Sequence, residues 1–302
     1  MLADDVERYL SLRRALGYEL RDVAINLRSY ARFADSRRDI HIHTATVHAW
    51  ATNAVSQSSR HRRFQHVIQL ARFLHAEDPE HEVPINPSHF RKHRKPPYIY
   101  TEEEIAQLIG AAYCLRESYP LQRRVYATLI GLIAATGLRN SEARSLRMDD
   151  VLPGGILHIR RTKFGKSRLV PMHPTVAEEL KCYMEARRKL PVADDHLFLS
   201  FGNKRLSSNT VTGTFRRLCQ HAGIVLSGKR QPRIHDLRHT LATRVLERCA
   251  MNRDVIARHF VALATYLGHA HMRYTYWYLE ATPELLGDIA SAAEMLIADE
   301  QT

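Results

Sequence analysis

Cysteine is scarce in this sequence, and its spacing argues against the common metal and disulfide motifs. The 302 residues include four widely separated cysteines and no CxxC pair; they are Cys114, Cys182, Cys219 and Cys249. Zinc ribbons and disulfide frameworks need closely spaced cysteines. We therefore expect reduced thiols, and we predict neither a bound metal ion nor a cofactor.

Long hydrophobic runs are also missing. No apolar stretch approaches the roughly 20 residues that a membrane-spanning helix needs. The first ten residues, MLADDVERYL, have neither the basic start nor the apolar centre of a signal peptide. We therefore expect a cytoplasmic protein with no membrane partner.

Acidic residues are too few to balance the basic ones. Lys and Arg number 44 against 32 Asp and Glu, which gives a net charge of +12 and a pI near 9.7. Such an excess is typical of proteins that bind a polyanion, although charge alone does not exclude a basic protein with another role. Hydrophobic residues make up 45% of the chain, and its length predicts about two domains.

Residues 1–90 have the pattern of four short helices. In each segment apolar residues recur at every third or fourth position, as on one face of a helix. The third helix is expected to begin with Thr44 as its N-cap, and the fourth follows Ser58. Four helices of this kind make a complete small domain.

Two basic clusters are candidates for contacts with a nucleic-acid backbone. The first opens the fourth helix and comprises Arg60, Arg62 and Arg63. The second lies in a proline-containing linker, residues 91–100, and includes Lys92 and Lys95. Either cluster alone could be solvated surface, but the basic character of the whole chain favours contacts with phosphate.

Residues 101–302 are expected to form a second, larger domain that starts with helices. Thr101 suits an N-cap because three glutamates follow it. An apolar segment over residues 121–135 predicts a buried helix that ends at Gly137. Ser141 is expected to cap the next helix.

The one clear β signal follows these helices. Two β-prone segments, residues 156–161 and 167–172, flank the turn TKFGK and predict a hairpin with Lys163 at its tip. The remainder is helical, with a capped helix that begins near Ser208 or Asn209. The predicted fold class is therefore mainly α with a small β-hairpin or sheet (α+β).

A tyrosine-rich stretch near the C-terminus suggests the chemistry. Tyr274, Tyr276 and Tyr278 follow closely behind a Gly-His pair. Tyrosine is a poor nucleophile at its ordinary pKa, so a catalytic one needs cationic neighbours. The upstream chain offers such residues, namely Arg139, Lys163, His235 and Arg238. This set suits attack on a phosphodiester better than attack on an acyl group.

Four segments carry a resemblance to a known family. They are ATGLRNSEARSL (135–146), TKFGKSRLVPM (162–172), HDLRHTLATR (235–244) and YLGHAHMRYTYWYL (266–279). Their order and spacing resemble those of the tyrosine recombinases, the phage integrase family, and the last segment resembles the integrases of mobile elements. The resemblance implies a helical core-binding domain (1–90), a basic interdomain linker (91–100) and a catalytic domain with a tail helix (101–302).

The resemblance also implies roles for matching residues. Tyr278, nine residues after His269, would attack the scissile phosphate and form a 3′-phosphotyrosine. Arg139 and Arg238 would hold the non-bridging oxygens as charge develops on them. His269 would donate a hydrogen bond to the phosphate.

Proton transfer would fall to two further residues. Lys163 would protonate the leaving 5′-oxygen, although Lys166 lies close enough in sequence to compete for that role. His235 would be the acid/base group. Glu142 stands where the family often has an acidic residue and would support the first arginine, while His239 would pack beside the site.

The tail offers an apolar stripe whose partner the sequence leaves open. The stripe comprises Leu285, Leu286, Ile289, Ala293, Leu296 and Ile297. A stripe of this kind usually packs on its own domain. The resemblance implies instead that the tail docks on a neighbouring protomer, within a homo-tetramer on two double-stranded DNA sites, with related recombinases as further partners.

The predicted function is site-specific recombination. A phosphotyrosine conserves the energy of the broken bond, so the implied reaction needs neither ATP nor a metal ion. Two other functions compete with it. One is DNA relaxation like that of a type IB topoisomerase, and the other is DNA binding by a regulator that has lost activity.

Overall fold

The computed structural model describes residues 1–86, 96–115, 121–160, 167–224, 231–248, 253–269, 271 and 275. Within these residues the protein is mainly helical with one three-stranded antiparallel sheet, which confirms the expected α+β class. The chain divides into two compact units, residues 1–95 and 96–302, called unit 1 and unit 2 below. Among the described helices, none is long and apolar enough to cross a membrane.

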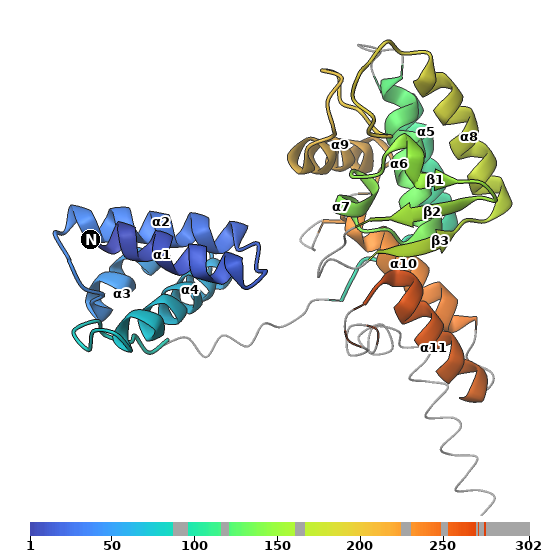
Figure 1. The fold of residues 1–302 in the computed structure, drawn as a ribbon. Helices are drawn as coiled ribbons and strands as arrows, with labels where there is room; N and C mark the ends of the chain where they lie inside the picture. The colour runs from blue at the N-terminus through green and yellow to red at the C-terminus, as the bar shows by residue number, and fades with distance from the viewer. Residues whose placement is uncertain are drawn as a thin grey trace, which may run out of the picture. The chain divides into compact units, whose positions relative to one another are not determined.

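Unit 1 contains the four predicted helices, but the third and the fourth start at other residues than predicted. The helices are α1 (Leu2–Ala15), α2 (Arg21–Ser36), α3 (Thr44–Thr52) and α4 (Gln57–His75) (Figure 1). Thr44 is the first residue of α3, and His43 is its N-cap. Helix α4 is capped by Ser56, which has the extended backbone of an N-cap and accepts a hydrogen bond from the Ser59 N–H. Ser58 therefore lies inside the helix.

The four helices enclose one hydrophobic core. Tyr30 and Trp50 pack edge to face with ring centroids 5.4 Å apart, and Leu27 and Phe64 are buried in the same cluster. Helices of this length are marginal in isolation. The shared core is therefore what stabilises each of them.

Unit 2 contains the remaining helices. They are α5 (Glu102–Tyr113), α6 (Gln122–Thr136), α7 (Asn140–Ala143), the 3₁₀ helix η1 (Met148–Asp150), α8 (Pro174–Arg188), α9 (Ser208–His221), α10 (Ile234–Glu247) and α11 (Arg253–Leu267). Thr101 caps α5 as predicted, through a reciprocal capping box with Glu104. Helix α9 begins at Ser208, as expected, behind the N-cap Ser207.

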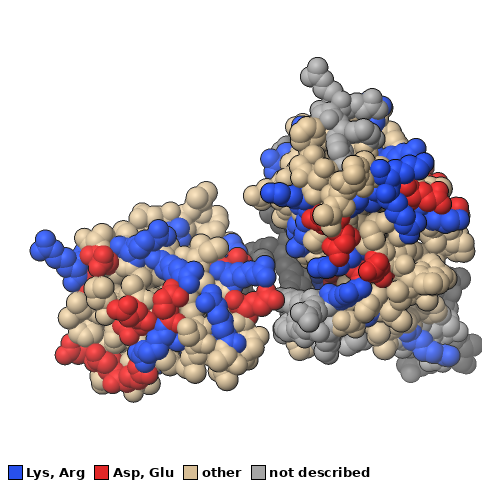
Figure 2. Space-filling view, turned by 45° about the horizontal axis from the view of Figure 1, so that its top comes forward, with Lys and Arg blue, Asp and Glu red and all other residues tan. Residues whose placement is uncertain are grey.

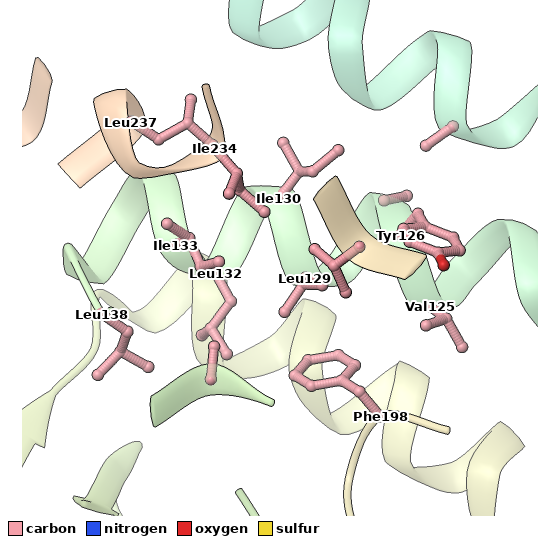
Figure 3. Packing of buried hydrophobic residues seen from close by; sticks show 14 of the residues in the cluster. Val125, Tyr126, Leu129, Ile130, Leu132, Ile133, Leu138, Phe198, Ile234 and Leu237 are labelled. Carbon is pink, nitrogen blue, oxygen red and sulfur yellow. The ribbon is translucent and has the colours of Figure 1, made fainter. Parts of the chain in front are cut away.

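Helix α6 lies at the centre of unit 2. Its apolar residues face several neighbours at once, including Phe198 and, on α10, Ile234 and Leu237 (Figure 3). A helix that is apolar on most sides is stable only when it is surrounded. The predicted buried helix is thus confirmed, and it ends at Gly137 as expected. Burial of α6 fixes where the chain emerges beside α10.

The sheet contains the predicted hairpin and one extra strand. Its strands are β1 (Val151–Leu152), β2 (Ile156–Ile159) and β3 (Arg168–Pro171), in the order β1-β2-β3. Leu157 lies opposite Val170, and Ile159 lies opposite Arg168. The sequence did not predict β1, because two residues carry no periodicity.

Candidate active site

Arg238 is a buried charge held by main-chain oxygens. Its side chain on α10 leaves the residue 1% exposed, and it donates hydrogen bonds to the carbonyls of Gly137 (2.6 Å) and Leu267 (2.7 Å). Gly137 has a φ of +62°, and a Cβ there would lie 2.8 Å from Leu267 Cδ2. Glycine therefore permits both the turn and the close packing that bring its carbonyl to the guanidinium.

Arg139 follows this turn and is the N-cap of α7. Its Nη1 donates to Glu142 Oε1 (2.7 Å) and its Nη2 to the Gly268 carbonyl (2.9 Å). Its backbone N–H donates to Glu142 Oε2 (2.9 Å). The predicted cap at Ser141 is wrong, because the Glu142 carboxylate reaches back to the start of the helix and Ser141 lies within it.

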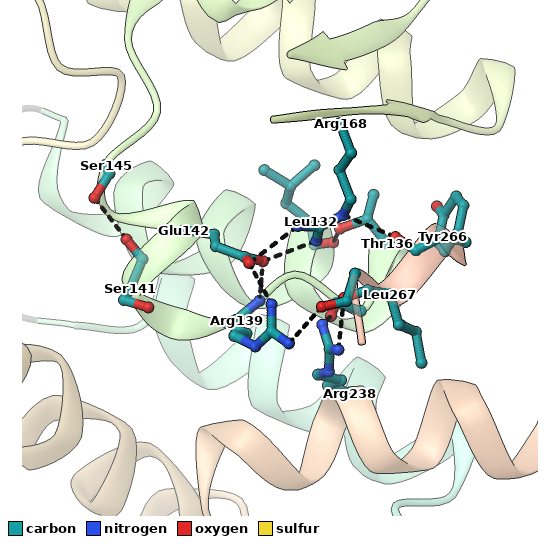
Figure 4. Close-up of polar contacts among 12 residues, drawn as sticks. Leu132, Thr136, Arg139, Ser141, Glu142, Ser145, Arg168, Arg238, Tyr266 and Leu267 are labelled. Atoms are coloured by element: carbon teal, nitrogen blue, oxygen red, sulfur yellow. Dashed lines mark hydrogen bonds and ion pairs between the residues drawn. The ribbon is translucent and has the colours of Figure 1, made fainter. Parts of the chain in front are cut away.

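The C-terminal end of α11 is where the arginines meet (Figure 4). Three successive carbonyls there accept hydrogen bonds from three side chains: Tyr266 from Arg168, Leu267 from Arg238 and Gly268 from Arg139. A helix C-terminus carries partial negative charge and attracts cations. The end of α11 is therefore tied to β3, α10 and α7 at once.

Glu142 is a buried carboxylate between two guanidiniums. It is 8% exposed and accepts hydrogen bonds from both Arg139 and Arg168. Burial raises its pKa, but the hydrogen bonds and charge of Arg168, together with those of Arg139, lower the pKa to about 2. Glu142 is thus ionised at neutral pH. Sequence analysis missed Arg168, since an arginine at a strand end gives no signal of a distant carboxylate.

Three histidines lie close to these arginines. Burial, followed by the charges of Arg238 and of other nearby arginines, lowers the pKa of His235 to about 4 and that of His269 to about 3. The pKa of His239 falls to about 3, first through burial and then through His235, whose ring centroid is 4.7 Å away. All three are therefore neutral at pH 7 and able to accept a proton.

A cleft of about 520 Å³ opens beside Arg139 and His235. The lining also contains Arg144, Arg216 and Arg233, polar residues of α7 and α9, and apolar residues such as Phe215 and Ile234. Arg139 and the neutral imidazole of His235 line this cleft and can together bind an oxyanion and take up a proton, whereas Arg238, which is 1% exposed, is not part of the lining. On the faces seen in Figure 2, basic and acidic side chains are interspersed in both units, so surface charge alone does not mark the site.

Carboxylates and histidines cluster at two other places in the described part of the chain, but internal hydrogen bonds occupy both groups. In the first, His81 Nδ1 accepts from the Ile42 N–H, which leaves the ring proton on the Nε2 that faces Asp78. That nitrogen is then no metal ligand. In the second, Asp194 accepts from the His196 backbone N–H.

The predicted site residues are thus distributed as follows. The structure brings together Arg139, His235, Arg238 and His269, and His269 Nδ1 lies 2.7 Å from Thr275 Oγ1. Outside the described residues lie Lys92, Lys95, Lys163, Lys166, Tyr274, Tyr276, Tyr278 and the tail stripe.

The predicted phosphate-binding cluster of unit 1 is not uniform. Arg62 is exposed on α4, and Arg60 is partly buried. Arg63 donates from Nη1 to the Trp50 carbonyl (2.9 Å), and its guanidinium lies over the Trp50 ring, 4.9 Å from the centroid. Arg63 therefore packs within unit 1, whereas Arg62 faces solvent.

Comparison with known proteins gives a consistent result. The model of the phage integrase family matches residues 99–284. A putative integrase/recombinase, y4rB of Sinorhizobium fredii, is 37% identical over 294 residues, which is 93% of this chain and 93% of that protein. The tyrosine recombinase XerA of Thermococcus kodakarensis is 29% identical over 67% of this chain and 65% of its own length.

Solved structures share the fold at low sequence identity. The integrase of transposon Tn1549, in complex with transposon right-end DNA, aligns with a TM-score of 0.66 at 17% identity, over 97% of this chain and 99% of that chain. A lambda integrase tetramer bound to a Holliday junction aligns with a TM-score of 0.63 at 19% identity, over 91% of this chain and 76% of that chain.

Proposed function

Because this chain belongs to the phage integrase family, whose members cleave and rejoin DNA strands, we propose that it is a site-specific recombinase that acts through Tyr278. The observation that carries the proposal is the pair of anchored guanidiniums, Arg139 and Arg238, beside the neutral imidazole of His235. Main-chain carbonyls orient both arginines. Donors that are fixed in advance stabilise developing charge without reorganisation.

In the proposed cleavage step, the Tyr278 oxygen attacks the scissile phosphorus and its proton passes to His235. The bond from phosphorus to the 5′-oxygen breaks, and Lys163 protonates the leaving oxygen. Arg139 and Arg238 neutralise the charge that gathers on the non-bridging oxygens. The products are a 3′-phosphotyrosine and a free 5′-hydroxyl, and attack by another 5′-hydroxyl reverses the step on a new strand.

The proposed step needs no external source of energy. The phosphotyrosine keeps the energy of the broken phosphodiester, so rejoining requires no ATP. The guanidiniums supply the positive charge that a metal ion supplies in other phosphoryl-transfer enzymes. His235 is unprotonated at pH 7, because its pKa is about 4 in the protein without DNA, and the negative charge of a bound phosphate would raise that pKa toward the working pH of a proton acceptor.

Double-stranded DNA is the proposed substrate, and a tetramer on two sites is the proposed assembly. The net charge of +12 and the cationic lining of the cleft favour a polyanion. Lambda integrase has been solved both as a dimer on a core site and as a tetramer on a Holliday junction. The integrase of transposon Tn1549 shares this fold, which favours the proposal of a role in a mobile element.

A covalent-adduct assay tests the proposal. Full-length protein first selects its binding sequence from random duplexes, and that sequence is then built into a nicked duplex from which the cleaved end diffuses away. Wild-type protein should accumulate covalent adducts, and Tyr278→Phe should bind the duplex without forming any. Adducts that persist in Tyr278→Phe, or that vanish instead in Tyr274→Phe or Tyr276→Phe, would reassign the nucleophile.

The same preparation separates the two alternatives. A topoisomerase of type IB would relax supercoiled DNA that lacks the selected sequence, whereas a recombinase would leave such DNA largely supercoiled. A regulator without activity would form no adduct on any substrate.

Truncation after Pro283 should preserve binding to one site but prevent tetramers on paired sites, as size measurements on the DNA complexes would reveal.

A further inference from the structure

Arg168 makes three hydrogen bonds to two other parts of unit 2. Its Nη1 donates to Glu142 Oε1 (3.0 Å), and its Nη2 donates to Glu142 Oε2 (2.9 Å). Its Nε donates to the Tyr266 carbonyl (2.9 Å) at the end of α11. The side chain is 13% exposed. A paired contact of this kind matches the planar fork of arginine and fixes the carboxylate in one orientation.

Arg168 also connects strand β3 with the C-terminal end of α11. It is the first residue of β3, directly after the hairpin turn, and it pairs with Ile159 of β2. A Cβ on Gly268 would lie 2.8 Å from Arg168 Nη1, so the guanidinium packs closely against that backbone. Arg168 thereby fastens the hairpin to the chain segment that carries His269.

The second partner of Glu142 connects Arg168 to the site. Glu142 accepts from the backbone N–H and from the side chain of Arg139 with the same two oxygens that bind Arg168. Loss of Arg168 would leave the buried carboxylate with one cationic side chain bonded to it. Glu142 could then rotate toward solvent or become protonated, and Arg139 would keep only its hydrogen bond to the Gly268 carbonyl as an anchor.

We propose, on the basis of the recombinase function above, that Arg168 is a positioning residue for strand cleavage. It holds Glu142, and through Glu142 it orients Arg139 toward the phosphate. Its bond to Tyr266 keeps the hairpin in register with the end of α11. Arg168 need not touch the DNA to do so.

Adduct formation on the nicked, selected duplex tests this role in a single turnover at saturating protein. Arg168→Met should slow adduct formation by about 100-fold, the loss expected when a reacting group is misplaced by about 1 Å. Arg168→Lys keeps the charge but not the fork, and its rate should lie between the two. In a Glu142→Gln background, Arg168→Met should add only about a twofold further loss, because the two residues act as one unit.

The pH profile separates positioning from a general loss of structure. Glu142 is faced by Arg139 and Arg168 and lies within electrostatic reach of His235 and His269. Without Arg168 the pKa of Glu142 should rise, because burial raises this pKa and only Arg139 would remain to lower it. The Arg168→Met rate should therefore fall with decreasing pH at a higher midpoint than the wild-type rate. Arg147→Met is the matched control, because it breaks a half-exposed pair with Asp195 and should change neither rate nor profile.

Measurements of unfolding test the same link between Arg168 and Glu142 without requiring catalysis. The difference in free energy of unfolding between wild type and Arg168→Met should narrow from pH 7 to pH 4, as protonation relieves the unpaired Glu142 carboxylate. In the Glu142→Gln background the narrowing should be smaller, because only the effect of Arg168 on the pKa of His269 remains. If Arg168→Met does not fold, Arg168→Lys takes its place in both measurements.

The outcomes are distinct. A wild-type rate and profile in Arg168→Met, additive losses with Glu142→Gln, or a difference in stability that is independent of pH would each overturn the positioning role. Absence of adducts from wild-type protein would instead contradict the recombinase function, and the unfolding data would still decide whether Arg168 holds Glu142.

Discussion

The N-terminal halves of α4 and α10 both carry arginines, yet the two helices use these residues differently. On α4, Arg63 donates to the Trp50 carbonyl and stacks on its ring at the surface of unit 1. On α10, Arg238 also donates to main-chain carbonyls, but it is 1% exposed. The comparison teaches that anchoring alone does not make a reactive site. Burial beside other cations is what distinguishes the proposed site, because charge is poorly screened where water is excluded.

The same difference governs the histidines of the two units. In unit 1, burial and then Arg62 lower the pKa of His66. Around Arg238, burial and several arginines act together on three histidines and lower each pKa to about 4 or below. In unit 1, partial burial and one exposed cation shift the pKa of a single histidine, whereas around Arg238 burial together with a group of anchored cations keeps three imidazoles unprotonated.

Substitution of the buried arginine should have the largest effect. Arg238→Lys keeps one positive charge but cannot span the carbonyls of Gly137 and Leu267 and also present a donor to phosphate. We expect adduct formation to fall by about 100- to 1,000-fold, as for removal of one fixed donor to a developing oxyanion, with DNA affinity nearly unchanged. Single-turnover rates and binding curves on the nicked duplex would measure both.

The same change in unit 1 provides the control. Arg28→Lys alters an arginine whose ion pair with Glu7 is about half exposed, so it should leave the cleavage rate unchanged. A rate for Arg238→Lys as high as that for Arg28→Lys would mean that the carbonyl anchors of Arg238 do not matter for chemistry.

The helices and strands of this site could be predicted from the sequence more readily than the contacts between them. The helices and the hairpin follow from periodicity, and the motif residues were identified because four segments occur together in order. Arg168 was missed because its partner, Glu142, lies 26 residues earlier and on another element. The cap at Ser141 was wrong for a related reason, since α7 starts before Ser141 and the Glu142 carboxylate accepts from the backbone N–H of the actual N-cap, Arg139.

Lowering the pH should reduce the free energy of unfolding of unit 2, because three of its histidines resist protonation in the folded state. His235, His239 and His269 have pKa values of about 4, 3 and 3 in the folded protein, against an ordinary value near 6.5. Because these values are depressed, their stabilising contribution is complete above about pH 6.5 and is lost as pH falls toward 4. His239→Gln should therefore lose about 2 kcal/mol less stability than wild type between pH 7 and pH 5.

Urea unfolding followed by circular dichroism at the two pH values would measure this difference. His66→Gln in unit 1 is a useful comparison, since one half-buried histidine near one arginine should give the smaller change in pH dependence. Equal pH dependence in wild type and His239→Gln would indicate that His239 accepts a proton in the folded state, and that the arginines do not suppress its charge.

The smallest expected effect distinguishes two neighbours on α4. Arg62 is exposed, whereas Arg63 is engaged by Trp50. If Arg62 contacts a DNA phosphate, Arg62→Ala should lower the slope of log affinity against log salt by about 0.9 and leave the free energy of unfolding unchanged. Arg63→Ala should instead destabilise unit 1 by about 1 kcal/mol, through loss of the cation–π contact and of one hydrogen bond.

Binding of the selected duplex across a salt series, together with urea unfolding of each variant, would separate these two roles. Arg72→Ala, further along α4, is the control for a change of one exposed charge on the same helix. A full loss of slope in Arg63→Ala with unchanged stability would show that Trp50 presents Arg63 to the phosphate. In that case the Trp50 anchor would orient Arg63 for DNA binding, just as the carbonyl anchors are proposed to orient Arg238 for catalysis.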